Sequence, residues 1–156
     1  MPTGRAFFGP PSRTFVPGGA HITVYLVPVH QGRLVVFDVA AREARGRWLP
    51  WDVLDFGANP YEAASALSDD WCGVALRDLS LVDVMSFPFE GGGWELAIVF
   101  RAELEAMPPG DADRKPLASP HGHFDAIGPF DPVDLKRWVG NQDDTSAGPP
   151  PPGLVF

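Results

Sequence analysis

Residues 48–74, WLPWDVLDFGANPYEAASALSDDWCGV, decide the fold that this chain is expected to adopt. The stretch predicts the end of a strand, a loop and one helix of about three and a half turns. Asn59 is a good N-cap, Pro60 suits the first helical position, and Glu62 can act as the third residue of a capping box. Gly73 supplies the stop signal. The other elements are placed relative to this helix.

Two apolar runs before this stretch predict a β-hairpin. Residues 20–30, AHITVYLVPVH, and residues 33–40, RLVVFDVA, are rich in β-branched and aromatic residues. Gln31 and Gly32 between them are a turn signal. Pro28 has no N–H for a ladder hydrogen bond, so we expect the first strand to lie at a sheet edge or to be bulged at that residue.

Two more strands and a closing helix are predicted after the first helix. Residues 79–87, LSLVDVMSF, alternate in polarity, and residues 94–104, WELAIVFRAEL, are more continuously apolar, as in a central strand covered on both faces. A short strand around residues 126–130 then leads to a last helix. Asp131 is the expected N-cap of that helix, and Pro132 occupies its first position.

The composition indicates one acidic domain. With 156 residues and 45% hydrophobic residues, the chain is long enough for one well-buried domain. A formal charge of -8 argues against binding long nucleic acid, because the 12 basic residues are scattered along the chain. The single cysteine, Cys72, excludes an internal disulfide, and we expect a buried thiol. We find no signal peptide and no apolar run of transmembrane length, so we expect a cytoplasmic protein with no membrane partner.

We divide the chain into an arm, a domain and a tail. The arm, residues 1–19, is rich in proline and glycine and carries three phenylalanines, so we expect it to pack on the domain or on a second subunit of a homodimer. The domain spans residues 20–140. The tail, residues 141–156, is polar and then polyproline, and we expect it to be flexible or extended.

The spacing within residues 48–74 resembles the Nudix box. The pattern of that box is G-x5-E-x7-R-E-U-x-E-E-x-G-U, with U aliphatic, and a W-x-x-P-G-G segment commonly precedes it. Laid on this chain without a gap, its lead-in, glycine, alanine and closing positions match Trp48, Leu49, Pro50, Gly57, Ala63, Ala64, Gly73 and Val74. The resemblance implies a Nudix fold over residues 20–140. This is an α/β (α+β) domain with a mixed β-sheet sandwiched between helices, found in a superfamily of hydrolases.

Most of the acidic residues of the Nudix box are missing here. The box's first Gly falls on Asp52, its first Glu on Ala58, its Arg-Glu pair on Ala66 and Leu67, and its final Glu-Glu pair on Asp70 and Trp71. Asp70 is thus the only acid retained of four. The family's reaction is attack by water on a nucleoside diphosphate linked to another group, and it needs Mg2+ or Mn2+ held by these carboxylates. A register slipped by one residue would use Asp69 and Asp70 as the closing pair, which makes them the candidate metal ligands, but we favour two solvated surface carboxylates.

The resemblance and the degenerate box together suggest a binding protein. In the leading hypothesis, the chain is a Nudix-fold protein that binds a nucleotide or another diphosphate-containing small ligand with little or no hydrolysis and needs no cofactor. The candidate pocket residues are Trp51, Asp52 and Trp71, because a tryptophan can stack on a base. No catalytic residue is assigned under this hypothesis.

Two other functions stay open. The first is metal-dependent hydrolysis of nucleoside diphosphate derivatives at a rearranged site that uses Mg2+ or Mn2+. Its candidate residues are Asp52, Asp55, Asp69, Asp70 and a loop histidine. The second is a protein–protein interaction domain, which would use the arm and the tail as contact elements.

Two groups of basic residues are candidates for phosphate binding. Four arginines lie in or after the second strand, although we favour solubilising charge on an exposed hairpin loop. They are Arg33, Arg42, Arg45 and Arg47. Residues 105–122 have the composition of a loop, with four prolines, and His121 and His123 lie at its end. The two histidines are a weak metal signal, but either can serve as an acid, a base or a phosphate donor if the loop folds over a pocket.

Overall fold

The computed structural model describes residues 20–40, 46–55, 57–88, 93–120 and 122–140. The arm and the tail lie outside these residues. The strands are β1 (Ala20–His30), β2 (Arg33–Val39), β3 (Gly46–Trp48), β4 (Trp51–Val53), β5 (Leu76–Pro88), β6 (Trp94–Leu104) and β7 (Arg114–Ala118). The helices are α2 (Pro60–Trp71) and α3 (Pro132–Val139).

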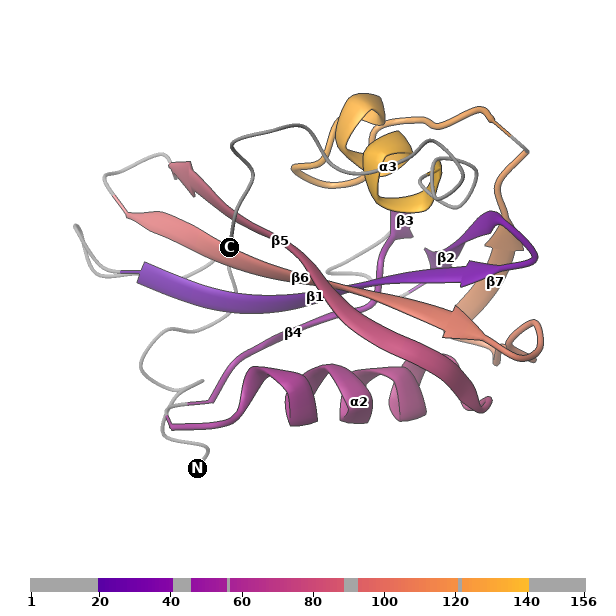
Figure 1. Ribbon diagram of the computed structural model, residues 1–156, viewed down its shortest axis with the longest axis horizontal. Helices are drawn as coiled ribbons and strands as arrows, with labels where there is room; N and C mark the ends of the chain where they lie inside the picture. Colours follow the sequence, from indigo (N-terminus) through magenta and orange to yellow (C-terminus); the bar gives the residue numbers. More distant parts are fainter. Residues whose placement is uncertain (1–19, 41–45, 56, 89–92, 121, 141–156) are drawn as a thin grey trace, which may run out of the picture.

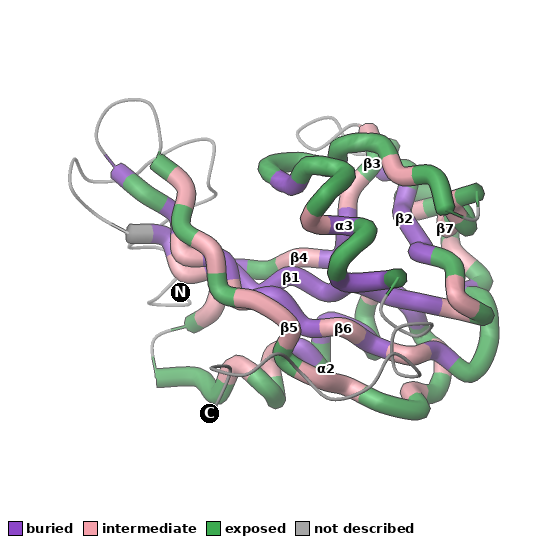
Figure 2. Tube along the Cα trace, turned by 45° about the horizontal axis from the view of Figure 1, so that its top comes forward, coloured by how far each residue is buried: buried purple, intermediate pink, exposed green. Residues whose placement is uncertain are grey.

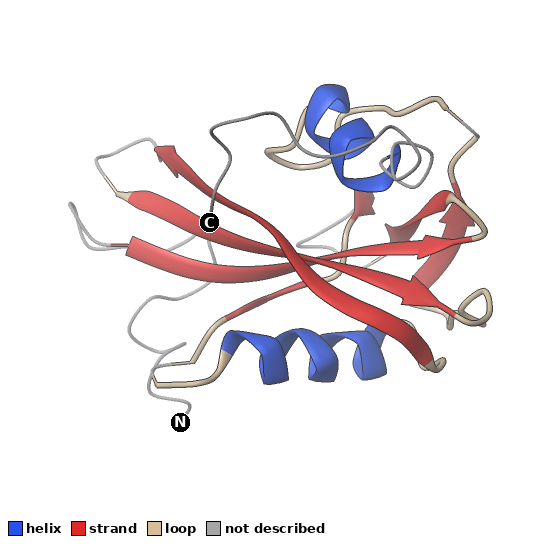
Figure 3. Ribbon diagram, in the orientation of Figure 1, coloured by secondary structure: helices blue, strands red, loops and turns tan. Residues whose placement is uncertain are grey.

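The strands form one mixed sheet between the two helices. Its order is β3-β2-β1-β6-β5, with β4 also paired to β1 and β7 to β2. β1 and β6 run parallel, whereas the other pairs are antiparallel. Figures 1 and 3 show α2 against one face of the sheet and α3 against the other. The predicted α+β class and the sheet sandwiched between helices are therefore confirmed.

β1 is the central strand, and both of its faces are buried. Tyr25, Val27 and Val29 belong to the hydrophobic core on the α3 side, whereas Val24 and Leu26 belong to the core on the α2 side. Successive side chains of a strand point to opposite faces, so the continuous apolar run of β1 fills both cores. β6 is central too, as predicted, and Figure 2 shows buried residues along both strands.

The expectation that Pro28 marks an edge or a bulge is wrong, because β1 is central and Pro28 is buried opposite Ala102 of β6. The reason is that, on the edge of β1 away from β6, the pairing strand changes from β4 to β2. Residues 23–25 pair with β4, and the amide of Leu26 donates to the Pro50 carbonyl at 2.9 Å. Pairing with β2 covers residues 29–30 only. Pro28 lies between the two partners, where a strand can lack an N–H without losing a ladder bond.

Helix α2 begins after Asn59 and ends before Gly73, as predicted. The Asn59 side chain accepts hydrogen bonds from the amides of Tyr61 at 2.8 Å and Glu62 at 3.3 Å, and Pro60 is the first helical residue. Gly73 has a φ of 66°, in the left-handed region that ends many helices. Cys72 is a buried free thiol, as expected, and burial raises its pKa to about 12.

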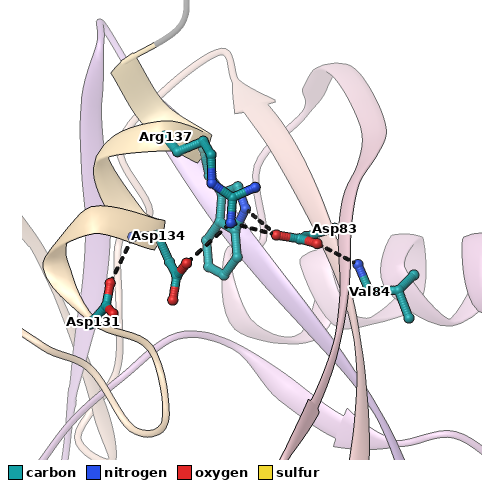
Figure 4. Close-up of polar contacts among 6 residues, drawn as sticks. Asp83, Val84, Asp131, Asp134 and Arg137 are labelled. Atoms are coloured by element: carbon teal, nitrogen blue, oxygen red, sulfur yellow. Dashed lines mark hydrogen bonds and ion pairs between the residues drawn. The ribbon is translucent and has the colours of Figure 1, made fainter. Parts of the chain in front are cut away.

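A polar cluster holds α3 against β5 (Figure 4). The Asp83 carboxylate accepts hydrogen bonds from Arg137 Nη2 at 2.7 Å, from the Trp138 indole at 3.1 Å and from the Val84 amide at 2.9 Å. Asp83 lies where the β5–β6 register shifts. A bulge of this kind re-aims a side chain, and here Asp83 faces the helix. Asp131 caps α3 as predicted, accepting from the Asp134 amide at 2.9 Å.

Two segments near the end of the domain differ from expectation. Residues 105–122 contain β7, which pairs with β2 over residues 35–39 and is not loop alone. Pro116 lies within β7, a placement that an outer strand tolerates. The short strand expected around residues 126–130 is only an isolated bridge between Ile127 and Phe130. Within the described residues, neither helix is long and apolar enough to cross a membrane.

Candidate functional site

An open cleft of about 560 Å³ runs along α2, between the helix and strands β1 and β4. We call it the α2 cleft. Its helical wall comes from residues spaced three and four apart, which share one face of a helix. It is lined by Val24, Asp52, Val53, Asp55, Gly57, Ala58, Asn59, Glu62, Ala63, Ala66, Leu67 and Asp70.

The α2 cleft is acidic and partly apolar. Four lining residues carry carboxylates, and none of the lining residues that the structure describes is a lysine or arginine. The carboxylates are spread along the cleft: in the described part of the chain, no three His, Cys, Asp or Glu side chains gather as a metal site would require. One of them, Asp52, accepts the Val53 amide at 2.8 Å. An anionic ligand in this cleft would therefore meet repulsion along most of its length.

Two of the three helix positions where the Nudix pattern has glutamates, 67 and 71, carry apolar side chains that pack in or against the protein core. Leu67 is 5% exposed and belongs to the core on the α2 side. Trp71 packs edge-on against Phe37 of β2, with ring centroids 5.4 Å apart. Mg2+ needs oxygen ligands, and neither side chain offers one. The residues of α2 thus do not fit the metal site that the Nudix resemblance implies.

Asp70 has a cationic partner from a distant part of the chain. Arg114 of β7 places Nη1 3.3 Å from Asp70 Oδ2, and the same nitrogen donates to the Asp70 carbonyl at 3.4 Å. Its guanidinium carbon lies 4.1 Å from the centre of the Trp71 ring, a cation–π contact. Asp70 is well exposed, so the ion pair contributes little stability, about 0–1 kcal/mol. The ion pair matters because it holds the Arg114 guanidinium beside Asp70, a lining residue of the α2 cleft.

The predicted site residues divide between the two faces of the sheet. Asp52 and Asp70 both line the α2 cleft, and so does Asp55 of the rearranged-site hypothesis. Trp51 precedes Asp52 on β4 and points to the opposite face, where it packs against the α3-side core. Trp71 and the exposed Asp69 are not among the lining residues. Ligand or metal binding by these residues stays a prediction.

The sequence interpretation missed Arg114, because its segment was expected to be loop and its partner lies 44 residues away. Glu95 of β6 is another residue to which the sequence interpretation assigned no role. Glu95 is 3% exposed and accepts a hydrogen bond from the Tyr25 hydroxyl at 2.9 Å. Burial raises the pKa of the Glu95 carboxyl. The available signal for such a buried pair was a glutamate directly before the continuous apolar run of residues 96–100.

The comparisons with known proteins identify the fold and little beyond it. No protein-family model and no curated protein matches the chain. Among solved structures, a MutT Nudix hydrolase from Burkholderia pseudomallei aligns with a TM-score of 0.56 at 19% identity, over 76% of this chain and 97% of that one. A Nudix hydrolase from Nitrosomonas europaea aligns with a TM-score of 0.52 at 13% identity, over 88% and 96% of the two chains.

An ADP compounds hydrolase also aligns, with a TM-score of 0.50 at 17% identity over 66% of this chain. This chain spans only 58% of that hydrolase's length. Identities this low show a shared fold and leave the activity open. The resemblance first seen in residues 48–74 is therefore confirmed at the level of structure: this chain contains a domain with the Nudix fold.

Proposed function

We propose that this Nudix-fold protein binds a nucleotide or another diphosphate-containing small ligand in the α2 cleft and leaves it largely intact. The observation that carries the proposal is the packing of Leu67 into the core and of Trp71 against it, at helix positions where the Nudix pattern has glutamates. Without those carboxylates, α2 lacks the oxygen ligands for a tightly held catalytic metal. The cleft itself, at about 560 Å³, is within the size range of small-ligand sites.

The distribution of charge suggests how such a ligand lies. Ala63, Ala66 and Leu67 form an apolar wall that suits a base or a sugar. The phosphates belong at the Asp70 end, where Arg114 is the nearby cation and already offsets one carboxylate. A guanidinium can donate two parallel hydrogen bonds to a phosphate, so Arg114 can exchange Asp70 for the ligand.

The test is a thermal-shift screen against nucleotides, nucleotide sugars, dinucleoside polyphosphates and ADP-ribose, each with and without Mg2+ and Mn2+. We expect stabilisation by at least one ligand, no need for metal, and no phosphate release. The variant Arg114→Gln should lose that stabilisation, whereas Arg77→Gln, which removes an exposed arginine from β5, should keep it. If no ligand stabilises the protein, or if Arg114→Gln and Arg77→Gln behave alike, the proposal is wrong.

A second candidate is metal-dependent hydrolysis at a rearranged site. The observation favouring it is that Asp52, Asp55 and Asp70 line one cleft together with Glu62. Turnover that requires Mg2+ or Mn2+ and disappears in Asp70→Ala would establish this function in place of simple binding. Turnover that persists in Asp70→Ala would point to a contaminating enzyme.

A further inference from the structure

A second cleft lies on the opposite face of the sheet from α2. It measures about 420 Å³ and is lined by residues of β2, β3, β7 and the segment that leads from β7 towards α3. We call it the β2–β7 cleft. Leu34 and Val36 of β2 are among its lining residues, and both belong to the α3-side core. The cleft is therefore separated from the α2 cleft by the sheet itself.

The floor of the β2–β7 cleft is apolar. Val36 and Leu117 are directly opposite each other on β2 and β7, and Ile127 adds a buried side chain from the following segment. Leu117 stays 40% exposed, although most large apolar side chains of the domain are covered. An exposed leucine beside buried apolar residues in a concave site is a surface that an apolar ligand group can cover.

The rim of this cleft carries two nitrogen-rich side chains that are far apart in the sequence. Arg47 comes from β3 and His123 from the segment after β7. Arg47 is exposed, and among the described residues its guanidinium has no hydrogen-bond or ion-pair partner. His123 Nε2 lies 3.4 Å from Asp125 Oδ1, and both side chains are largely exposed. The histidine can exchange this partner for a ligand.

We propose that the β2–β7 cleft binds a small organic phosphate, with the phosphate held by Arg47 and His123 and an apolar or aromatic body lying over Leu34, Val36 and Leu117. The guanidinium and the imidazole supply donors that suit a phosphate, and the apolar floor suits a flat ring. The Asp125 carboxylate competes with the phosphate for His123. This site uses none of the residues of the α2 cleft and does not depend on the function proposed there.

The experiment is a titration of the full-length protein, labelled with 15N, with adenosine monophosphate, inorganic phosphate and adenosine in separate arms. We expect adenosine monophosphate to bind more tightly than either fragment and to shift the amides of β2 and β7. Arg47→Gln and His123→Gln should each weaken its affinity by about tenfold, the effect of losing one hydrogen bond to a charged group. Asp125→Asn should strengthen it, because the competing carboxylate is removed.

Two controls separate this site from others. Arg33→Gln removes an exposed arginine of the same strand pair that does not line the cleft, and it should leave the affinity unchanged. Arg114→Gln, which tests the α2 cleft, should also leave it unchanged. The proposal is overturned by no binding of adenosine monophosphate at millimolar concentration, by equal losses in Arg47→Gln and Arg33→Gln, or by amide shifts confined to α2.

Discussion

The substitution Leu67→Glu tests whether α2 is a core helix or an open metal site. Leu67 is 5% exposed, so the new carboxylate would enter the core on the α2 side. Emptying a leucine site costs about 2–5 kcal/mol, and an uncompensated buried charge costs about 3–5 kcal/mol. Asp70 on the next turn has the same sign and adds repulsion. We expect a loss of about 3–5 kcal/mol from a total stability of about 5–15 kcal/mol.

The assay is urea unfolding followed by tryptophan fluorescence, with and without Mg2+. Two control variants divide the effect into its parts. Leu67→Met keeps the volume and should cost less than about 1.5 kcal/mol. Ala66→Glu puts a carboxylate on the same cleft wall at an exposed position and should cost about 0.5 kcal/mol or less. A Leu67→Glu variant within about 1 kcal/mol of the wild type, and further stabilised by Mg2+, would refute the assignment of this face to the core.

Three further predictions concern other parts of the domain. Asp83→Ala should lower the free energy of unfolding by about 1–3 kcal/mol, because it removes one of the two carboxylate partners of Arg137 and leaves the Trp138 indole unpaired. Asp78→Ala on the same strand is the control for urea unfolding. The raised pKa of Glu95 means that the folded state disfavours its ionised form, so the wild type should lose stability relative to Glu95→Gln as the pH rises above 4.5, the ordinary pKa of the carboxyl. Urea midpoints of the two proteins that change in parallel with pH would contradict this. With its pKa raised to about 12, Cys72 should resist a thiol reagent at pH 8 in the native protein and react quickly in urea.

Local signals predicted the parts of the fold that depend on neighbouring residues. The cap at Asn59 and the turn at Gln31 and Gly32 are set by backbone groups within a few residues, so the sequence contains the whole cause. The strand status of residues 114–118 depends on pairing with β2, about 80 residues earlier. Pro116 also made that strand hard to predict, because a proline within a run of residues argues against a strand.

The candidate site was predictable only where it lies on one element. Residues 63, 67 and 70 are spaced three and four apart along α2, so they share one face of the helix, and the cleft follows that face. Trp51 and Asp52 were both predicted to be pocket residues, but adjacent residues of a strand point to opposite faces. The contact of Arg114 with Asp70, and the placement of Arg47 and His123 around one cleft, depend on how distant strands pair, and no local pattern contains that information.

The packing of α2 shows why stability and metal binding compete on this helix. A glutamate at position 67 or 71 would have to reach a solvated metal, so its turn of the helix would need to stand open to the cleft. Leu67 instead contributes a buried side chain to the core, and Trp71 covers Phe37 while supporting the Arg114 guanidinium. Burying a full leucine side chain is worth about 1.5–3 kcal/mol, a sizeable fraction of the stability of a small domain. In this chain the helix face therefore stabilises the fold, and any ligand must be recognised by the cleft wall and by arginines that come from the strands.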